Sequence, residues 1–195
     1  MSLAPREKII ATTCALLESQ GYHATGLNQI VKESGAAKGS LYHYFPSGKE
    51  EIASEAIRSV SLLTAGRVRR HLADVSGAAE AVETFVLEIA RLVEESDFQA
   101  GGPLTTVALE TATTSPRLNL ACREAYSRLQ AVFEEKLAGK GFSAPLSASL
   151  AVMIVAAVEG GIILSRTAHS GDPLRIVAAH LAGLIRSYSP SSTGV

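Results

Sequence analysis

The sequence GAAKGSLYHYFPSGKEE, residues 35–51, places a run of polar aromatic residues between a glycine turn and a proline. Ala37, Leu41 and Phe45 are four residues apart, so on a helix they form one apolar row. The other rows carry polar or small residues: Lys38, Gly39, Ser40, Tyr42, His43 and Tyr44. The spacing predicts a short helix whose apolar row packs on a core. Pro46 ends it, because proline disfavours helix at the residue before it.

Neighbouring residues predict two helices before this one and a long helix after it. Apolar residues recur at helical spacing over residues 6–20, which end at Gly21, and over residues 27–34, which end at Gly35. A fourth helix is expected to begin at Lys49. Three helices in about forty-five residues, the last two joined by a glycine-containing turn, are typical of a helix-turn-helix.

The rest of the chain predicts only helices. Glycine and proline breaks divide it into four or five further helices, and no stretch alternates as a strand does. The composition changes near residue 50, so we expect an all-α protein with two domains, residues 1–48 and residues 49–195. The tail after Tyr188 is expected to be disordered.

Composition indicates a globular protein without a strong charge of either sign. The 195 residues are 47% hydrophobic and 19% charged, with a net charge of −1. Cys14 and Cys122 are far apart, which favours free thiols in a reducing compartment. The longest apolar run, residues 150–158, is shorter than the ~18 residues of a membrane span. We therefore expect a cytoplasmic protein with no membrane partner.

The polar rows of the short helix suit DNA. Lysine reaches phosphates or guanine, and tyrosine and histidine offer hydrogen-bonding groups. Two helix N-termini, at Thr25-Gly26 and at Lys49, offer free N–H groups to phosphates. The alternatives are that Tyr42 and Tyr44 cover a core, or that the chain is a helical protein-interaction module without DNA binding.

Residues 6–55 resemble the DNA-binding domain of the TetR family of transcriptional repressors, through the run IIATTCALLESQGYHATGLNQIVKESGAAKGSLYHYFPSGKEEI. The resemblance implies phosphate contacts for Thr25, Tyr42 and Lys49. It places Lys38, Gly39 and His43 in the major groove, and Tyr44 in either position. Gly26 departs from the family pattern, because a second hydroxyl residue is common there. The expected DNA-binding residues are Thr25, Gly26, Lys38, Gly39, Ser40, Tyr42, His43, Tyr44 and Lys49.

A dimer is expected from the C-terminal helices. Residues 150–164 are apolar on nearly every face except at Glu159, and such a helix must be buried on every face. The last helix carries a broad apolar stripe. We expect these two helices of each of two chains to form the interface; the alternative is that both are core helices of a monomer. The expected interface residues are Glu159, Gly160, Gly161, Ile163, Leu164, Val177, His180, Leu181 and Leu184.

The larger part of the chain resembles the regulatory domain of the LmrA/YxaF-like branch of the same family, in GGPLTTVALETA, CREAYSRLQAVFEEKL and VEGGIILSRTAHSGDPL. We expect a repressor that a small hydrophobic or aromatic effector releases from a double-stranded DNA operator. The candidate ligand residues are Phe85, Leu92, Thr105, Thr106, Leu109, Glu110, Tyr126, Phe133 and Met153, for each of which ordinary core packing is the alternative. Glu159 is expected to be either structural or in contact with the ligand.

An enzyme is not expected. The five histidines show no HExxH spacing, and no G-x-S-x-G sequence is present. Ser47-Gly48-Lys49 ends like a phosphate-binding loop but lacks the earlier glycine and a preceding strand. We expect no cofactor and no metal.

Overall fold

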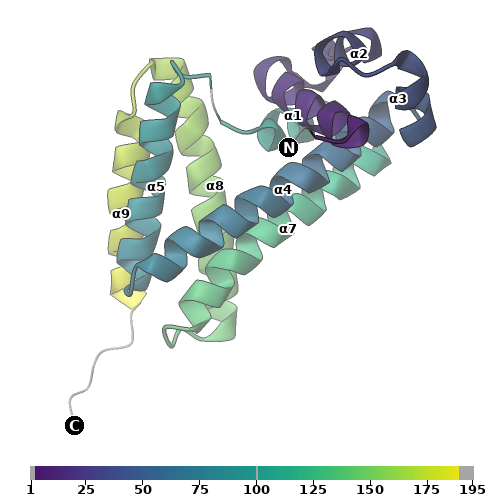
Figure 1. Ribbon diagram of the computed structural model, residues 1–195. Coiled ribbons are helices and arrows are strands. Elements are labelled where there is room, and N and C mark those ends of the chain that lie inside the picture. Colours follow the sequence, from purple (N-terminus) through teal and green to yellow (C-terminus); the bar gives the residue numbers. More distant parts are fainter. Residues whose placement is uncertain (1–2, 100, 189–195) are drawn as a thin grey trace. The chain divides into compact units, whose positions relative to one another are not determined.

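The structure is a computed structural model that describes residues 3–99 and 101–188. Within these residues it contains nine helices and no strand, which confirms the all-α prediction (Figure 1). The helices are α1 (Pro5–Ala24), α2 (Leu27–Ser34), α3 (Lys38–Tyr44), α4 (Lys49–Asp74), α5 (Ala78–Glu95), α6 (Pro103–Thr111), α7 (Pro116–Ala138), α8 (Ala144–Ala168) and α9 (Asp172–Tyr188). The tail that was expected to be disordered lies outside the described residues.

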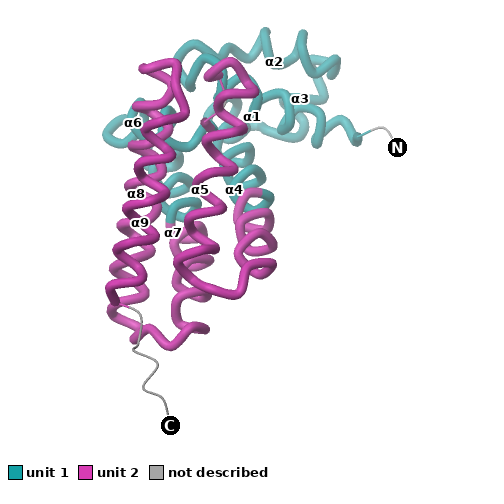
Figure 2. The backbone as a smooth tube through the Cα atoms, turned by 90° about the vertical axis from the view of Figure 1, so that its left-hand side faces the viewer, with its two compact units in different colours: residues 1–63, 102–126 teal, residues 64–101, 127–195 magenta. Residues whose placement is uncertain are grey.

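The chain forms two compact units (Figure 2). Unit 1 comprises Met1–Leu63 and Gly102–Tyr126, and unit 2 comprises Thr64–Gly101 and Ser127–Val195. Helices α4 and α7 each contribute to both units. The expected domain boundary between residues 48 and 49 stays a prediction, because the units group helices by their packing rather than by that position.

Unit 1 is built around α1, which packs against α2, α3 and α6. Its core includes Ile9, Leu17, Ile30, Leu41 and Phe45, each at most 1% exposed. The predicted apolar row of the short helix is therefore buried at Leu41 and Phe45. Ala37, the first member of that row, is exposed because it lies at the N-cap of α3.

Helix α1 runs further than its sequence predicts. Gly21 has φ 78° and ψ −178°, so the helix is kinked there and takes one more turn, to Ala24. The glycine that was expected to end the helix bends it instead. This kinked turn, residues 21–24, leads directly into Thr25 and Gly26 before α2.

Unit 2 contains α5, α8 and α9, and α9 packs against both of the others. Ion pairs join α9 to both ends of α5: Arg175 Nη2 lies 2.7 Å from Glu94 Oε2, and Arg186 Nη2 lies 2.9 Å from Glu83 Oε2 and 3.2 Å from Glu80 Oε1. Salt bridges this exposed contribute little to stability, because solvent screens them. The buried apolar faces of α5 and α9 hold the two helices together.

Among the described helices, α8 alone has the length and apolar composition that crossing a membrane requires. The core helix of a soluble protein has the same properties, so this is weak support for a span. One face of α8 is buried within unit 2, at Leu150, Ile154, Val158 and Ile162.

Candidate nucleic-acid interface

Helix α3 is held by its apolar side and exposes its polar side. Lys38, Gly39 and His43 are exposed, Ser40 is half-buried, and Tyr42 and Tyr44 are 47% and 37% exposed. The Tyr44 ring meets the His43 ring edge-on, with centroids 5.2 Å apart. The structure brings these six predicted residues onto one short helix, but their contacts with DNA stay predictions.

The turn into α3 begins at Gly35, the C-cap of α2, with φ 65° and ψ 14°. This left-handed conformation favours glycine, because a Cβ would crowd the backbone there. Gly26, the N-cap of α2, has an ordinary extended conformation, and a Cβ added to it would meet no atom within 4 Å. A hydroxyl residue would fit at Gly26 without strain, so the chain omits it for no steric reason.

Thr25 differs from its expected role. Its side chain is 1% exposed, and its hydroxyl donates to the Gly21 carbonyl at 2.6 Å. Its backbone N–H donates to the Tyr22 carbonyl at 3.2 Å. The structure thus makes Thr25 a buried cap of the kinked turn rather than a surface donor.

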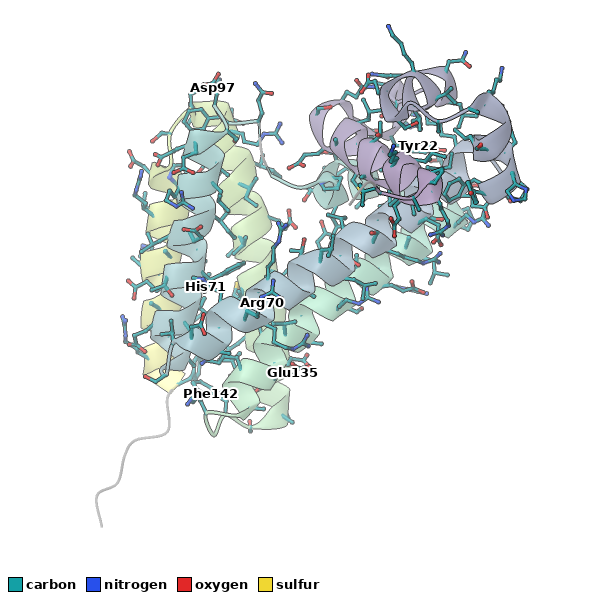
Figure 3. The ribbon with its side chains drawn as sticks, viewed as in Figure 1. Tyr22, Arg70, His71, Asp97, Glu135 and Phe142 are labelled. Carbon is teal, nitrogen blue, oxygen red and sulfur yellow. The ribbon has the colours of Figure 1, made fainter. Side chains whose placement is uncertain are left out.

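Lys49, at the start of α4, lies over the kinked turn. Its ammonium nitrogen is 4.2 Å from the centroid of the Tyr22 ring and 3.4 Å from the His23 carbonyl oxygen, to which it donates. Tyr22 is labelled on α1 in Figure 3. Burial lowers the pKa of Lys49, and the Glu110 carboxylate partly offsets this. Burial also raises the pKa of Tyr22, with a further contribution from Glu50. The Lys49 charge is therefore held close to the predicted DNA-binding surface.

Sequence reasoning missed Arg6 as a residue of this region. Its guanidinium carbon lies 5.4 Å from the centroid of the Phe45 ring, and its Nη2 lies 2.9 Å from Glu55 Oε2. Arg6 thus links α1, the C-cap of α3 and α4. No local pattern could identify it, because its partners are distant in the sequence.

The candidate ligand residues divide between the two units. In unit 1, Thr105 and Tyr126 share a hydrogen bond of 3.3 Å between their hydroxyl oxygens, and Thr106 and Glu110 face Gly21 of α1. Leu109 is 77% exposed and therefore lines no interior of its unit.

In unit 2, the Phe85 and Phe133 rings pack with centroids 5.7 Å apart, and Phe133 is buried. Leu92 and Met153 are 47% and 52% exposed. Their side chains, like that of Leu109, are therefore not part of the buried core, and their contacts with a ligand stay predictions.

The predicted interface residues divide between two faces of α8 and α9. Gly161 and Leu181 are buried inside unit 2, which differs from the prediction: a Cβ at Gly161 would lie 2.8 Å from Leu174 Cδ2, so this glycine lets α8 approach α9. The others are exposed or half-buried, and a Cβ added at Gly160 would meet no atom within 4 Å. They are Glu159, Gly160, Ile163, Leu164, Val177, His180 and Leu184.

The described residues contain no cluster of side chains that could hold a metal ion. Across residues 3–99 and 101–188, no three His, Cys, Asp or Glu side chains gather as metal ligands. Cys14 and Cys122 are free thiols, and burial raises the pKa of each to about 11.

Known proteins resemble the chain over nearly its whole length. Residues 9–56 match the family of bacterial regulatory proteins called the tetR family, and residues 78–180 match the C-terminal domain of LmrA/YxaF-like transcriptional regulators. The chain is 40% identical to the uncharacterized HTH-type transcriptional regulator YxaF of Bacillus subtilis, over 93% of this chain and 95% of YxaF. It is 37% identical to the HTH-type transcriptional regulator LmrA of Bacillus subtilis, over 93% of this chain and 96% of LmrA.

Solved structures share the fold. E. coli NemR in its reduced form superposes with a TM-score of 0.78 at 18% identity, covering 98% of this chain and 100% of NemR. A TetR regulator from Chloroflexus aurantiacus gives 0.77 at 25% identity, covering 93% and 94%. The regulator FadR from Bacillus subtilis, in complex with stearoyl-CoA, gives 0.69 at 17% identity, covering 92% and 96%.

Fold, exposed helix and relatives together define a DNA-binding transcriptional regulator of the helix-turn-helix class, not an enzyme. The chain belongs to the TetR family, with a C-terminal part of the LmrA/YxaF-like kind. Both resemblances expected from the sequence are confirmed.

Proposed function

We propose that the protein is a cytoplasmic repressor that binds a paired operator as a homodimer and that a small, largely hydrophobic ligand releases. The observation that carries DNA recognition is the exposed polar side of α3: Lys38, Gly39 and His43 are exposed while Leu41 and Phe45 anchor the helix. Lysine and histidine donors on such a row suit base edges in the major groove.

Selection of duplexes from a random pool, followed by footprinting, tests this function. We expect the wild type to select a two-fold symmetric site. His43→Ala is expected to change which bases are preferred, while a phosphate-contacting variant lowers affinity for all sequences alike. A wild-type protein that selects no sequence, or His43→Ala with unchanged preferences, would reject this assignment of the surface.

The proposed repressor role, as distinct from DNA binding, is tested by a measurement in cells. A reporter gene placed behind the selected site is expected to be silenced by the wild type and not by a variant that no longer binds DNA. Activation of the reporter would contradict the repressor assignment and leave DNA binding intact.

The homodimer is supported by the exposed apolar side of α8. Val152, Met153, Ile163 and Leu164 are between 46% and 59% exposed, although the opposite side of the helix is packed inside unit 2. Exposed apolar surface of this kind marks an interaction site. Covering it with the same surface of a second copy gives the two-fold symmetry that paired half-sites require. We propose that a second copy of the chain, rather than lipid, covers the exposed apolar side of α8.

Release by a hydrophobic ligand is supported by the aromatic pair Phe85 and Phe133 in unit 2. A protein of the same fold, FadR, carries stearoyl-CoA, a ligand with a long apolar chain. A tenfold loss of operator affinity requires that the ligand prefer the released state by ~1.4 kcal/mol. Thermal shift with a panel of fatty acyl and aromatic compounds, followed by operator release with each hit, tests this proposal. If compounds bind but leave operator affinity unchanged, the ligand-release proposal is rejected.

A further inference from the structure

The kinked turn, residues 21–24, is held by a carboxylate from α6. The His23 backbone N–H donates to Glu110 Oε2 at 2.8 Å, and the two residues are 87 positions apart. The His23 ring nitrogen Nε2 also lies 3.4 Å from the Glu110 carbonyl oxygen. Both residues belong to unit 1, so α6 is bound directly to the turn that leads into α2.

Gly21 makes room for this carboxylate. A Cβ at Gly21 would collide with Glu110 Oε1 and lie 3.1 Å from Thr106 Cγ2. Its φ of 78° also favours glycine, since L side chains rarely adopt that conformation. One residue thus supplies both the bend in α1 and the space that Glu110 occupies.

The carbonyl group of the same residue, His23, is bound from α4. Lys49 donates to the His23 carbonyl and covers the Tyr22 ring. The turn therefore has its N–H group bound by an acid of α6 and its carbonyl bound by the lysine that is predicted to contact DNA phosphate. The Glu110 carboxylate is also close enough to raise the pKa of Lys49.

We propose that Glu110 is a positioning residue for DNA binding: it fixes the kinked turn, and through the turn it fixes the N-terminus of α2 and Lys49. This inference rests on the proposed DNA-binding surface. In this role Glu110 touches no DNA and acts by accepting the His23 N–H. It replaces the expectation that Glu110 contacts the effector.

A positioning role and simple electrostatics predict opposite effects of removing Glu110 on DNA affinity. A carboxylate near a DNA-binding surface repels phosphates, so its removal alone would raise affinity for every duplex. A positioning role gives the reverse result, because the freed turn no longer presents Lys49 and α2 together. Glu110→Ala removes acceptor and charge, whereas Glu110→Gln keeps an oxygen acceptor and removes only the charge.

The test measures binding of wild type, Glu110→Ala and Glu110→Gln to the duplex that the wild type selects from a random pool, over a series of salt concentrations. We expect Glu110→Ala to bind about tenfold more weakly, as the loss of a charged hydrogen bond implies, with a salt slope smaller by about 1 as Lys49 leaves its phosphate. We expect Glu110→Gln to stay within about threefold of the wild type, because it keeps the acceptor.

Glu18→Ala is the matched control. Glu18 Oε1 accepts the Gly102 N–H at 2.9 Å, so it also joins α1 to α6 by a carboxylate–backbone bond, but at the other end of α6. Operator affinity close to that of the wild type is expected for it. An equal loss in Glu18→Ala and Glu110→Ala would show that general loosening of α6, and not the kinked turn, controls binding.

A readout without DNA separates positioning from unfolding. Exchange of the His23 amide hydrogen is expected to speed up in Glu110→Ala and to stay slow in Glu110→Gln, with both variants folded by circular dichroism. If Glu110→Ala binds as tightly as the wild type or more tightly, or if Glu110→Gln loses as much as Glu110→Ala, the inference is wrong. A wild type that selects no duplex would instead overturn the proposed function, while the amide exchange would still report on the Glu110–His23 bond.

Discussion

The Lys49 ammonium nitrogen lies 4.2 Å from the centroid of the Tyr22 ring, so the first residue of α4 is stacked on the kinked turn of α1. A cation over an aromatic ring at an exposed site is stabilised by about 0.5–1 kcal/mol. In the proposed phosphate contact, Lys49 either keeps its place on the Tyr22 ring or loses that amount of stabilisation. The loss of DNA affinity measured in a Lys49 variant therefore reflects the phosphate contact less any stabilisation by the Tyr22 ring that binding gives up.

Lys49→Ala is expected to weaken binding to all duplexes alike and to reduce the salt slope by about 1, because one phosphate contact is lost. Fluorescence anisotropy at several salt concentrations measures both quantities. Lys49→Arg, which keeps the charge, serves as the control and is expected to retain the slope. A loss confined to particular base sequences would contradict a phosphate contact.

Gly161→Ala is expected to destabilise the protein, because the new methyl group would lie 2.8 Å from Leu174 Cδ2 and 3.4 Å from Val177 Cγ2. Overpacking of this kind costs about 1–3 kcal/mol, less the gain of up to about 1 kcal/mol that alanine brings to a helix. Gly66→Ala is the control, since only Arg70 Nη1, at 3.9 Å, lies near its added methyl group. Denaturant unfolding should separate the two variants, and equal midpoints would refute the close approach of α8 and α9.

Ile163→Glu and Leu164→Glu are expected to separate the proposed dimer without unfolding the subunit. Both side chains are exposed in the single chain, at 46% and 59%, so a charge costs little there until a partner covers it. Light scattering after size exclusion should fall from twice 20.4 kDa to 20.4 kDa. Leu87→Glu, on an exposed position of α5, should leave the mass unchanged; a wild type that is already monomeric would reject the interface.

Cys14 and Cys122 are expected to resist alkylation in the folded protein. Burial raises the pKa of each thiol to about 11, so at pH 8 only about one in a thousand is the reactive thiolate. Mass spectrometry after iodoacetamide treatment should show no label without denaturant and two labels with it. Rapid labelling of the native protein would contradict the burial.

The same pKa shifts set a dependence of stability on pH. Unfolded thiols ionise near their ordinary pKa of 9.0 and folded thiols only near 11, so the native state holds more protons between these values. The contribution of the two thiols is therefore complete below about pH 9 and is lost as pH rises toward 11. Replacing both cysteines with alanine should make the free energy of unfolding depend less on pH between about 9 and 11. An unchanged dependence would show that other groups cause the loss of stability in this range.

The sequence predicted α2 over residues 27–34 and the end of α3 before Pro46, because these depend on helical spacing and on local glycine and proline signals. It also predicted which side of α3 is buried, since Leu41 and Phe45 share one row. It did not predict that Thr25 is buried, because the acceptor of its hydroxyl becomes available only through the kink at Gly21.

The chain's sequence by itself determined the class of protein. A dense pattern over residues 6–55 specifies a helix-turn-helix, because that motif depends on residues that are close together in the sequence. Tertiary structure alone decided the roles of residues whose partners are distant. Helix packing places Leu174 against Gly161 but no atom within 4 Å of a Cβ added at Gly160. It also places the Glu110 carboxylate beside the His23 amide. The physical reason is that periodicity fixes which residues share a helical face, whereas only the packing of one helix on another decides what that face meets.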